Sequence, residues 1–78
     1  MPHVIIKLWP GKSDEQKAQL SEAITASFAQ IMGSKESSVS VAFEEVPSDQ
    51  WMDQVYGPDI QAKWDSLQKP PGYGPGRE

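Results

Sequence analysis

One residue at the start of the chain has the chemistry needed for proton transfer. Pro2 directly follows Met1, and once the methionine is removed its ring nitrogen is a secondary amine held at the start of a strand. Such an amine can act as a general base, because apolar neighbours or a nearby cation lower its pKa toward the operating pH. Trp9 and Lys12 are candidates for those two influences. The alternative is that Pro2 only begins a strand, a position where proline destabilises the sheet little.

The rest of the sequence offers little conventional catalytic chemistry. It has no cysteine and a single histidine, His3, so it provides neither a thiolate nucleophile nor a histidine cluster for a metal ion. No glycine-rich phosphate loop or zinc-protease motif is present. The acidic pairs Asp14-Glu15 and Glu44-Glu45 are expected to be solvated charges at the ends of elements. We therefore expect neither a metal ion nor a cofactor.

The elements that must position Pro2 are predicted to form a βαβ unit. A strand is expected over residues 3–9, where β-branched residues are dense and apolar residues alternate. A helix should begin after Ser13, which has capping-box spacing to Gln16, and end at Gly33. A second, half-buried strand is expected over residues 37–46. Two strands joined by a helix should be parallel.

Apolar periodicity predicts the core of this unit. On the first strand, three alternating residues share one face, namely Val4, Ile6 and Leu8, while Ile5, Lys7 and Trp9 lie on the other. The helix carries an apolar stripe that should cover the sheet, and it consists of Leu20, Ile24, Phe28 and Ile31.

After Pro47 the sequence predicts an irregular polar segment and then a second helix. Pro58 suits the first turn of that helix, and three apolar residues are spaced as on one helical face, namely Ile60, Trp64 and Leu67. Residues 69–78 have proline or glycine at six of ten positions, so we expect an extended or loose tail. No linker or repeat divides the chain, and residues 1–78 are expected to form a single domain.

Size and charge limit the partners of this chain. A domain of 78 residues buries only about 60% of the surface of its unfolded chain, so self-association is expected. The net charge of −4 disfavours a nucleic-acid partner, since phosphate contacts need cations. No signal peptide and no membrane-length apolar segment is found. We therefore expect no membrane partner and a cytoplasmic location.

Three stretches in a fixed order resemble the 4-oxalocrotonate tautomerase superfamily. They are PHVIIKLWPGKSDEQK from Pro2, SKESSVSVAFEEV from Ser34 and KPPGY from Lys69. The last is similar to the end of the tautomerase PptA group within that superfamily, and the resemblance runs from Pro2 to about Tyr73. It implies an α/β fold in which two βαβ protomers form a homodimer. The dimer has a four-stranded sheet with helices on one face, and each protomer adds a second C-terminal helix.

The same resemblance implies a keto-enol tautomerase that needs no cofactor. The neutral nitrogen of Pro2 takes the enolic hydroxyl proton of a 2-hydroxy-2-alkenoate or an arylpyruvate enol. It then returns a proton to carbon, which gives the 2-oxo acid. One amine thus serves as general base and as general acid.

Two positions differ from the oxalocrotonate subgroup and bear on the substrate. That subgroup has arginine where Lys12 stands and, from a neighbouring subunit, a second arginine where Ser40 stands. Lys12 can hold one carboxylate as a point charge, and Ser40 offers a neutral hydrogen bond. A monocarboxylate with an aromatic or apolar body is therefore expected, with phenylpyruvate enol as the choice. By the resemblance, Trp9 and Trp51 form the apolar wall of the site.

Several alternatives remain open from the sequence. The chain can be a non-catalytic oligomeric module whose sheet and tryptophans bind a small molecule or a protein. Hydratase, decarboxylase and dehalogenase activities also occur on this superfamily's scaffold. Lys12 can be a solvated loop residue, and Trp51 and Trp64 can be core or interface anchors. The resemblance implies hexamers for the oxalocrotonate subgroup and dimers for the PptA group, and the extra helix and tail of this chain favour the homodimer.

Overall fold

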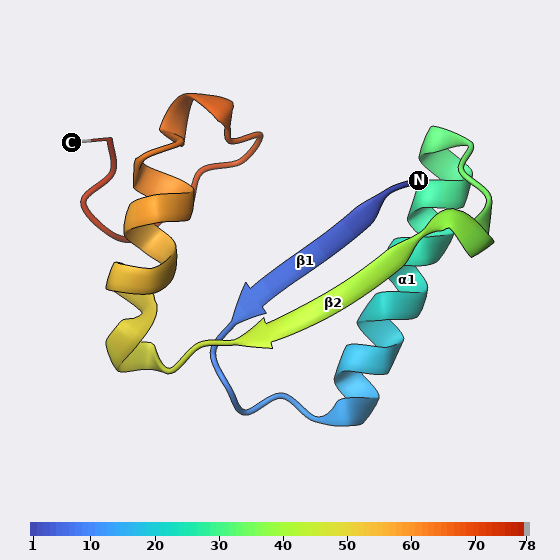
Figure 1. The fold of residues 1–78 in the computed structure, drawn as a ribbon, viewed down its shortest axis with the longest axis horizontal. Coiled ribbons are helices and arrows are strands. Elements are labelled where there is room, and N and C mark those ends of the chain that lie inside the picture. Colours follow the sequence, from blue (N-terminus) through green and yellow to red (C-terminus); the bar gives the residue numbers. More distant parts are fainter. Residues whose placement is uncertain (78) are drawn as a thin grey trace. The chain divides into compact units, whose positions relative to one another are not determined.

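The computed structural model describes residues 1–77 and divides into two compact units. The first unit is Met1–Glu45, and the second begins at Val46. Figure 1 shows the strands and the long helix of the first unit, and the shorter helical segments of the second in yellow to red. The prediction of a single domain stays a prediction.

The first unit is the predicted βαβ arrangement. Strand β1 (His3–Leu8) is followed by helix α1 (Asp14–Met32) and strand β2 (Ser40–Glu45). The two strands pair in parallel along their whole length (Figure 1), from His3 opposite Ser40 to Leu8 opposite Glu45. Both strands are shorter than predicted, because Trp9 lies beyond β1 and a 3₁₀ turn, η1 (Glu36–Ser38), precedes β2.

Local side-chain chemistry fixes both ends of α1. The Ser13 hydroxyl accepts a hydrogen bond from the Gln16 backbone N–H at 3.1 Å, and the Gln16 side-chain oxygen accepts from the Ser13 N–H at 3.0 Å. This reciprocal pair is the predicted capping box, which satisfies N–H groups that have no partner inside the helix. At the other end Gly33 adopts the left-handed conformation, with φ of 72°. The predicted start and end of this helix are confirmed.

The first unit buries its apolar side chains only in part. On β1 the alternation is as predicted, with Val4, Ile6 and Leu8 half-buried and Ile5 exposed. On α1, Ile24 and Phe28 are half-buried, but Leu20 and Ile31 are 45% and 75% exposed, and no side chain of the helix is buried. The expectation that the whole apolar stripe of α1 packs on the sheet is therefore wrong for this chain by itself. A sheet of two strands is too narrow to cover the full length of the stripe.

The second unit is helical from an earlier residue than predicted. A short 3₁₀ turn, η2 (Ser48–Gln50), leads into a π-type helix, η3 (Met52–Gln61), and a second 3₁₀ turn, η4 (Trp64–Ser66), follows. Pro58 lies inside η3 and not in the first turn of a helix. Proline lacks an N–H and crowds the preceding turn of an α-helix, and a wider π turn accommodates it. The predicted irregular segment and the predicted helix start were both wrong.

The core of the second unit is Val46, Val55 and Tyr56, the only apolar residues among 1–77 that are fully buried. The tail packs against Tyr56, whose hydroxyl accepts a hydrogen bond from the Gly76 N–H at 2.7 Å. The Gln61 side-chain amide donates to the Gly76 carbonyl at 3.0 Å. These hydrogen bonds hold the tail to η3, so of the two expected states, extended or loose, the loose one is wrong, and residues 69–77 form no helix or strand. None of the helices in residues 1–77 is long and apolar enough to cross a membrane.

Candidate active site

Pro2 and Ser40 lie together at one end of the sheet. Pro2 directly precedes β1 and is half-buried, and its carbonyl accepts a hydrogen bond from the Ser40 N–H at 3.1 Å. The Ser40 hydroxyl is 2.6 Å from Nδ1 of His3. The register of the two strands thus pairs the Ser40 hydroxyl with the His3 imidazole and joins the Ser40 backbone to that of the candidate base. Met1 is fully exposed, so its removal breaks no buried packing.

Trp9 and Lys12 lie beyond the opposite end of the same strand. Trp9 follows the last residue of β1 and is 58% exposed, and Lys12 is exposed in the loop that leads to α1. At about 3.3 Å per residue, the seven steps from Pro2 to Trp9 span roughly 23 Å. The structure therefore does not bring Pro2 together with Trp9 and Lys12 within one chain.

Lys12 lines a cleft of about 200 Å³. Its lining is mostly apolar, and the residues are Leu8, Lys12, Gln16, Lys17, Leu20 and Phe43. Lys17 is engaged elsewhere, since its ammonium lies 2.5 Å from Oε2 of Glu45. Lys12 forms no ion pair with a carboxylate among residues 1–77. The cleft thus combines apolar walls with one cation that is not neutralised, which suits an anion with an apolar body.

Trp51 belongs to the second unit and immediately precedes η3. It is half-buried, and its indole N–H donates a hydrogen bond to the Tyr73 hydroxyl at 2.9 Å. Sequence reasoning missed this role of Tyr73. The only signal was its place in the stretch KPPGY, which says nothing about the indole.

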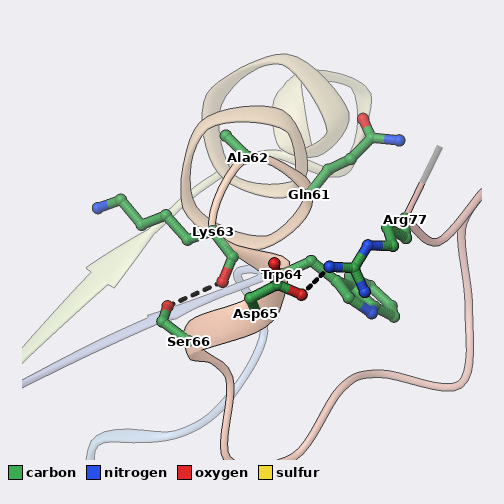
Figure 2. A pocket seen from close by; sticks show the side chains of 7 residues that line it. All are labelled: Gln61, Ala62, Lys63, Trp64, Asp65, Ser66 and Arg77. Carbon is green, nitrogen blue, oxygen red and sulfur yellow. Dashed lines mark hydrogen bonds and ion pairs between the residues drawn. The ribbon is translucent and has the colours of Figure 1, made fainter.

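A second cleft, of about 330 Å³, lies in the second unit and contains none of the predicted site residues. Figure 2 shows Trp64 in its wall and the ion pair between Arg77 and Asp65, while the Lys63 side chain extends to the other side. Because Asp65 neutralises Arg77, this cleft is a poor anion site. Within residues 1–77, no three histidine, cysteine, aspartate or glutamate side chains are grouped so that they could hold a metal ion.

Comparison with protein families identifies the scaffold. The sequence model of the family described as "Tautomerase enzyme" matches residues 2–58, which is well over half of the chain. The chain belongs to the tautomerase family. The protein is thus a tautomerase, an isomerase that moves a proton within its substrate, as the sequence analysis predicted.

Curated relatives place this tautomerase near the PptA group. It is 46% identical over 74 residues to a probable tautomerase of Xylella fastidiosa, a match that covers 95% of this chain and 90% of the relative. It is 42% identical over 74 residues to tautomerase PptA of Pectobacterium carotovorum, with 94% and 97% covered. The predicted resemblance to the PptA group is confirmed.

Solved structures agree with the α/β fold of this tautomerase. The crystal structure of YwhB, a homologue of 4-oxalocrotonate tautomerase, superimposes with a TM-score of 0.59 and 35% identity over 62% of this chain and 79% of YwhB. TomN, a 4-oxalocrotonate tautomerase homologue of the tomaymycin biosynthetic pathway, gives a TM-score of 0.62 and 31% identity, with 83% and 97% covered. The protein is therefore a member of the 4-oxalocrotonate tautomerase superfamily.

Proposed function

We propose that this tautomerase interconverts the enol and keto forms of 2-oxo acids such as phenylpyruvate, with Pro2 as the base once Met1 has been removed. The neutral ring nitrogen accepts the proton of the enolic hydroxyl, the oxygen becomes the carbonyl, and the electrons of the carbon-carbon double bond take up a proton from the prolinium at C3. No atom or electron is gained or lost. The amine regains its neutral form at the end of each turnover.

The observation that carries this proposal is the family match, which begins at Pro2. Two features of the structure support it. Pro2 stands at the start of a fully paired strand and not in a free terminus, so a backbone hydrogen bond between its carbonyl and Ser40 holds its ring in place. The Met1 side chain packs against nothing, so an aminopeptidase can reach the bond that must be cut to free the amine.

The substrate carboxylate is assigned to Lys12 and the apolar body to the surrounding cleft. Lys12 provides a cation that no carboxylate among residues 1–77 neutralises, and Leu8, Leu20 and Phe43 provide apolar contact. A single lysine holds one carboxylate, and Ser40 adds at most a neutral hydrogen bond. A monocarboxylate is therefore preferred to a dicarboxylate. Trp9 and Trp51 are assigned to the apolar wall on the resemblance, since neither lines the cleft of a single chain.

The length of β1 requires a second copy of the chain in this proposal. A 2-oxo acid cannot bridge the roughly 23 Å between Pro2 and the Trp9–Lys12 end of the strand. When strands of two copies run antiparallel, the start of one lies beside the end of the other. A homodimer with a four-stranded sheet then joins Pro2 of one copy to Lys12 of its partner.

Incomplete burial in the first unit supports self-association. Apart from Met1, five large apolar side chains of this unit stay more than 40% exposed among residues 1–77, and they are Ile5, Trp9, Leu20, Ile31 and Met32. No residue of Met1–Glu45 is fully buried. Covering such side chains contributes about 25 cal/mol for each Å² of apolar surface removed from water. A second copy is thus expected to stabilise the unit as well as to complete the site.

A complementation experiment tests the shared site. Pro2→Ala and Lys12→Ala variants are each assayed for phenylpyruvate ketonisation with substrate well below KM, where both lose most of the rate, then mixed in equal amounts, unfolded and refolded together. If the site joins two copies, half of the dimers are mixed and each has one intact site, so about a quarter of the wild-type rate returns. If both residues act within one copy, mixing restores nothing and the shared site is refuted.

A further inference from the structure

The C-terminal tail of this tautomerase is joined to the candidate aromatic wall by a continuous set of contacts. The Trp51 indole N–H donates to the Tyr73 hydroxyl at 2.9 Å. The Tyr73 ring packs on the Tyr56 ring, with centroids 5.5 Å apart and planes tilted by 51°. Tyr56 is 1% exposed, the most deeply buried side chain among residues 1–77. Trp51 is thus tied through Tyr73 to the core of the second unit.

The tail itself is held at Gly76, three residues after Tyr73, by two hydrogen bonds to residues of η3. The Gly76 N–H donates to the Tyr56 hydroxyl at 2.7 Å, and the Gln61 amide donates to the Gly76 carbonyl at 3.0 Å. Gly74 lies so close to the Tyr56 ring that an added Cβ would be 2.5 Å from its carbon atoms. The tail backbone therefore has little freedom to move the Tyr73 hydroxyl away from the indole.

We propose that Tyr73 is a positioning residue that fixes the orientation of the Trp51 indole and thereby the selectivity of the site for aromatic over aliphatic substrates. This inference rests on the proposed function, in which Trp51 forms part of the substrate's apolar wall. An indole has a single hydrogen-bond donor, and the Tyr73 hydroxyl satisfies it. A ring fixed before binding does not have to be ordered by the substrate, so its stacking contributes more fully to affinity.

The test compares Tyr73→Phe with wild type, because phenylalanine keeps the ring on Tyr56 and removes only the hydroxyl that accepts from Trp51. The ratio of kcat/KM for phenylpyruvate enol to that for the enol of an aliphatic 2-oxo acid is expected to fall about three- to tenfold, as for the loss of one hydrogen bond. Ser66→Ala is the matched control. It removes another hydroxyl of the second unit, one that donates to the Lys63 carbonyl at 2.8 Å, and should leave the ratio unchanged.

Two further measurements separate positioning from a general effect on stability. In a ¹H–¹⁵N spectrum, Tyr73→Phe should shift the one indole signal that Trp51→Phe removes and leave those of Trp9 and Trp64 in place. In the Trp51→Phe background there is no indole N–H to hold, so adding Tyr73→Phe should not change the substrate ratio further. This is a double-mutant cycle whose coupling energy reports the contact itself.

The inference is overturned if Tyr73→Phe lowers the rates for both substrates equally, or if it changes the ratio just as much in the Trp51→Phe background. Either result would show that Tyr73 acts only through the stability of the tail. Failure of the proposed function has a different outcome, since the wild type would then ketonise neither enol faster than Pro2→Ala does. The indole signal would still shift in that case.

Discussion

Replacing Gly74 by alanine should destabilise the second unit strongly, because of both its backbone conformation and its close packing. Other glycines of the tail allow the two contributions to be measured separately. Gly74 has φ of +81°, and an added Cβ would lie 2.5 Å from two carbon atoms of the buried Tyr56 ring. The left-handed conformation costs a residue other than glycine about 1–2 kcal/mol. Overpacking against a ring that cannot move away adds about 1–3 kcal/mol. The expected loss of unfolding free energy is therefore about 2–5 kcal/mol.

Two other glycines of the same tail serve as matched controls. Gly76 has φ of +78° but no atom within 4 Å of an added Cβ, so Gly76→Ala isolates the backbone cost of about 1–2 kcal/mol. Gly72 has neither a positive φ nor a close neighbour. Gly72→Ala should therefore be neutral, or stabilising by up to about 1 kcal/mol because it restricts the unfolded chain.

The assay is urea unfolding at one fixed protein concentration, because self-association makes apparent stability concentration-dependent. The unfolding midpoint should fall in the order Gly72→Ala, Gly76→Ala, Gly74→Ala, and the last should lie about 1 M or more below wild type. Equal midpoints for Gly74→Ala and Gly72→Ala would refute the account of the tail as a segment packed on Tyr56.

Three further predictions concern the first unit. Ser13→Ala removes the capping hydroxyl of α1 and should lower the unfolding free energy by about 1 kcal/mol, and an unchanged urea midpoint would contradict the capping box. Lys12→Ala should raise KM for phenylpyruvate about tenfold or more with a smaller change in kcat. Lys35→Ala, which lies outside the cleft, should match wild type. If steady-state assays give Lys12→Ala the same KM as wild type, Lys12 does not bind the substrate. Because the base must be neutral, kcat/KM should rise with pH through the pKa of the Pro2 amine and then level off, and a pH–rate profile that instead falls over that limb would contradict an amine base.

The sequence predicted the first unit well because its signals are local. The capping box of Ser13 with Gln16, the left-handed Gly33 and the alternation along β1 each depend on neighbours a few residues away. The extent of burial was predicted less well. Whether Ile31 is covered depends on the width of the sheet, and residues 1–77 of a single chain contribute two strands to it.

The second unit was harder to predict because its structure depends on contacts between distant residues. Proline is common in the first turn of a helix, but Pro58 lies inside η3. The tail has the composition of a loose segment, but its order comes from Tyr56, which lies 20 residues before Gly76 in the chain. No periodic pattern indicates that a glycine backbone will pack on a buried ring.

The candidate site was predicted only in part. Pro2 as the base stays a prediction from its residue type, its position and the resemblance, while the strand register explains why the Ser40 N–H meets the Pro2 carbonyl. Separation of Pro2 from Lys12 follows from the length of β1, but the sequence does not say which surface of a second copy would bring them together. Tyr73 escaped notice because its hydrogen bond to Trp51 joins residues that share no local motif.

The most direct test of the central claim is intact mass spectrometry together with phenylpyruvate ketonisation on the same preparations of wild type and Pro2→Ala. The account predicts that the wild type lacks Met1 and is active, and that the folded Pro2→Ala variant loses most of the rate. A processed, folded wild type without activity, or a variant that matches it, would contradict the assignment of Pro2 as the base.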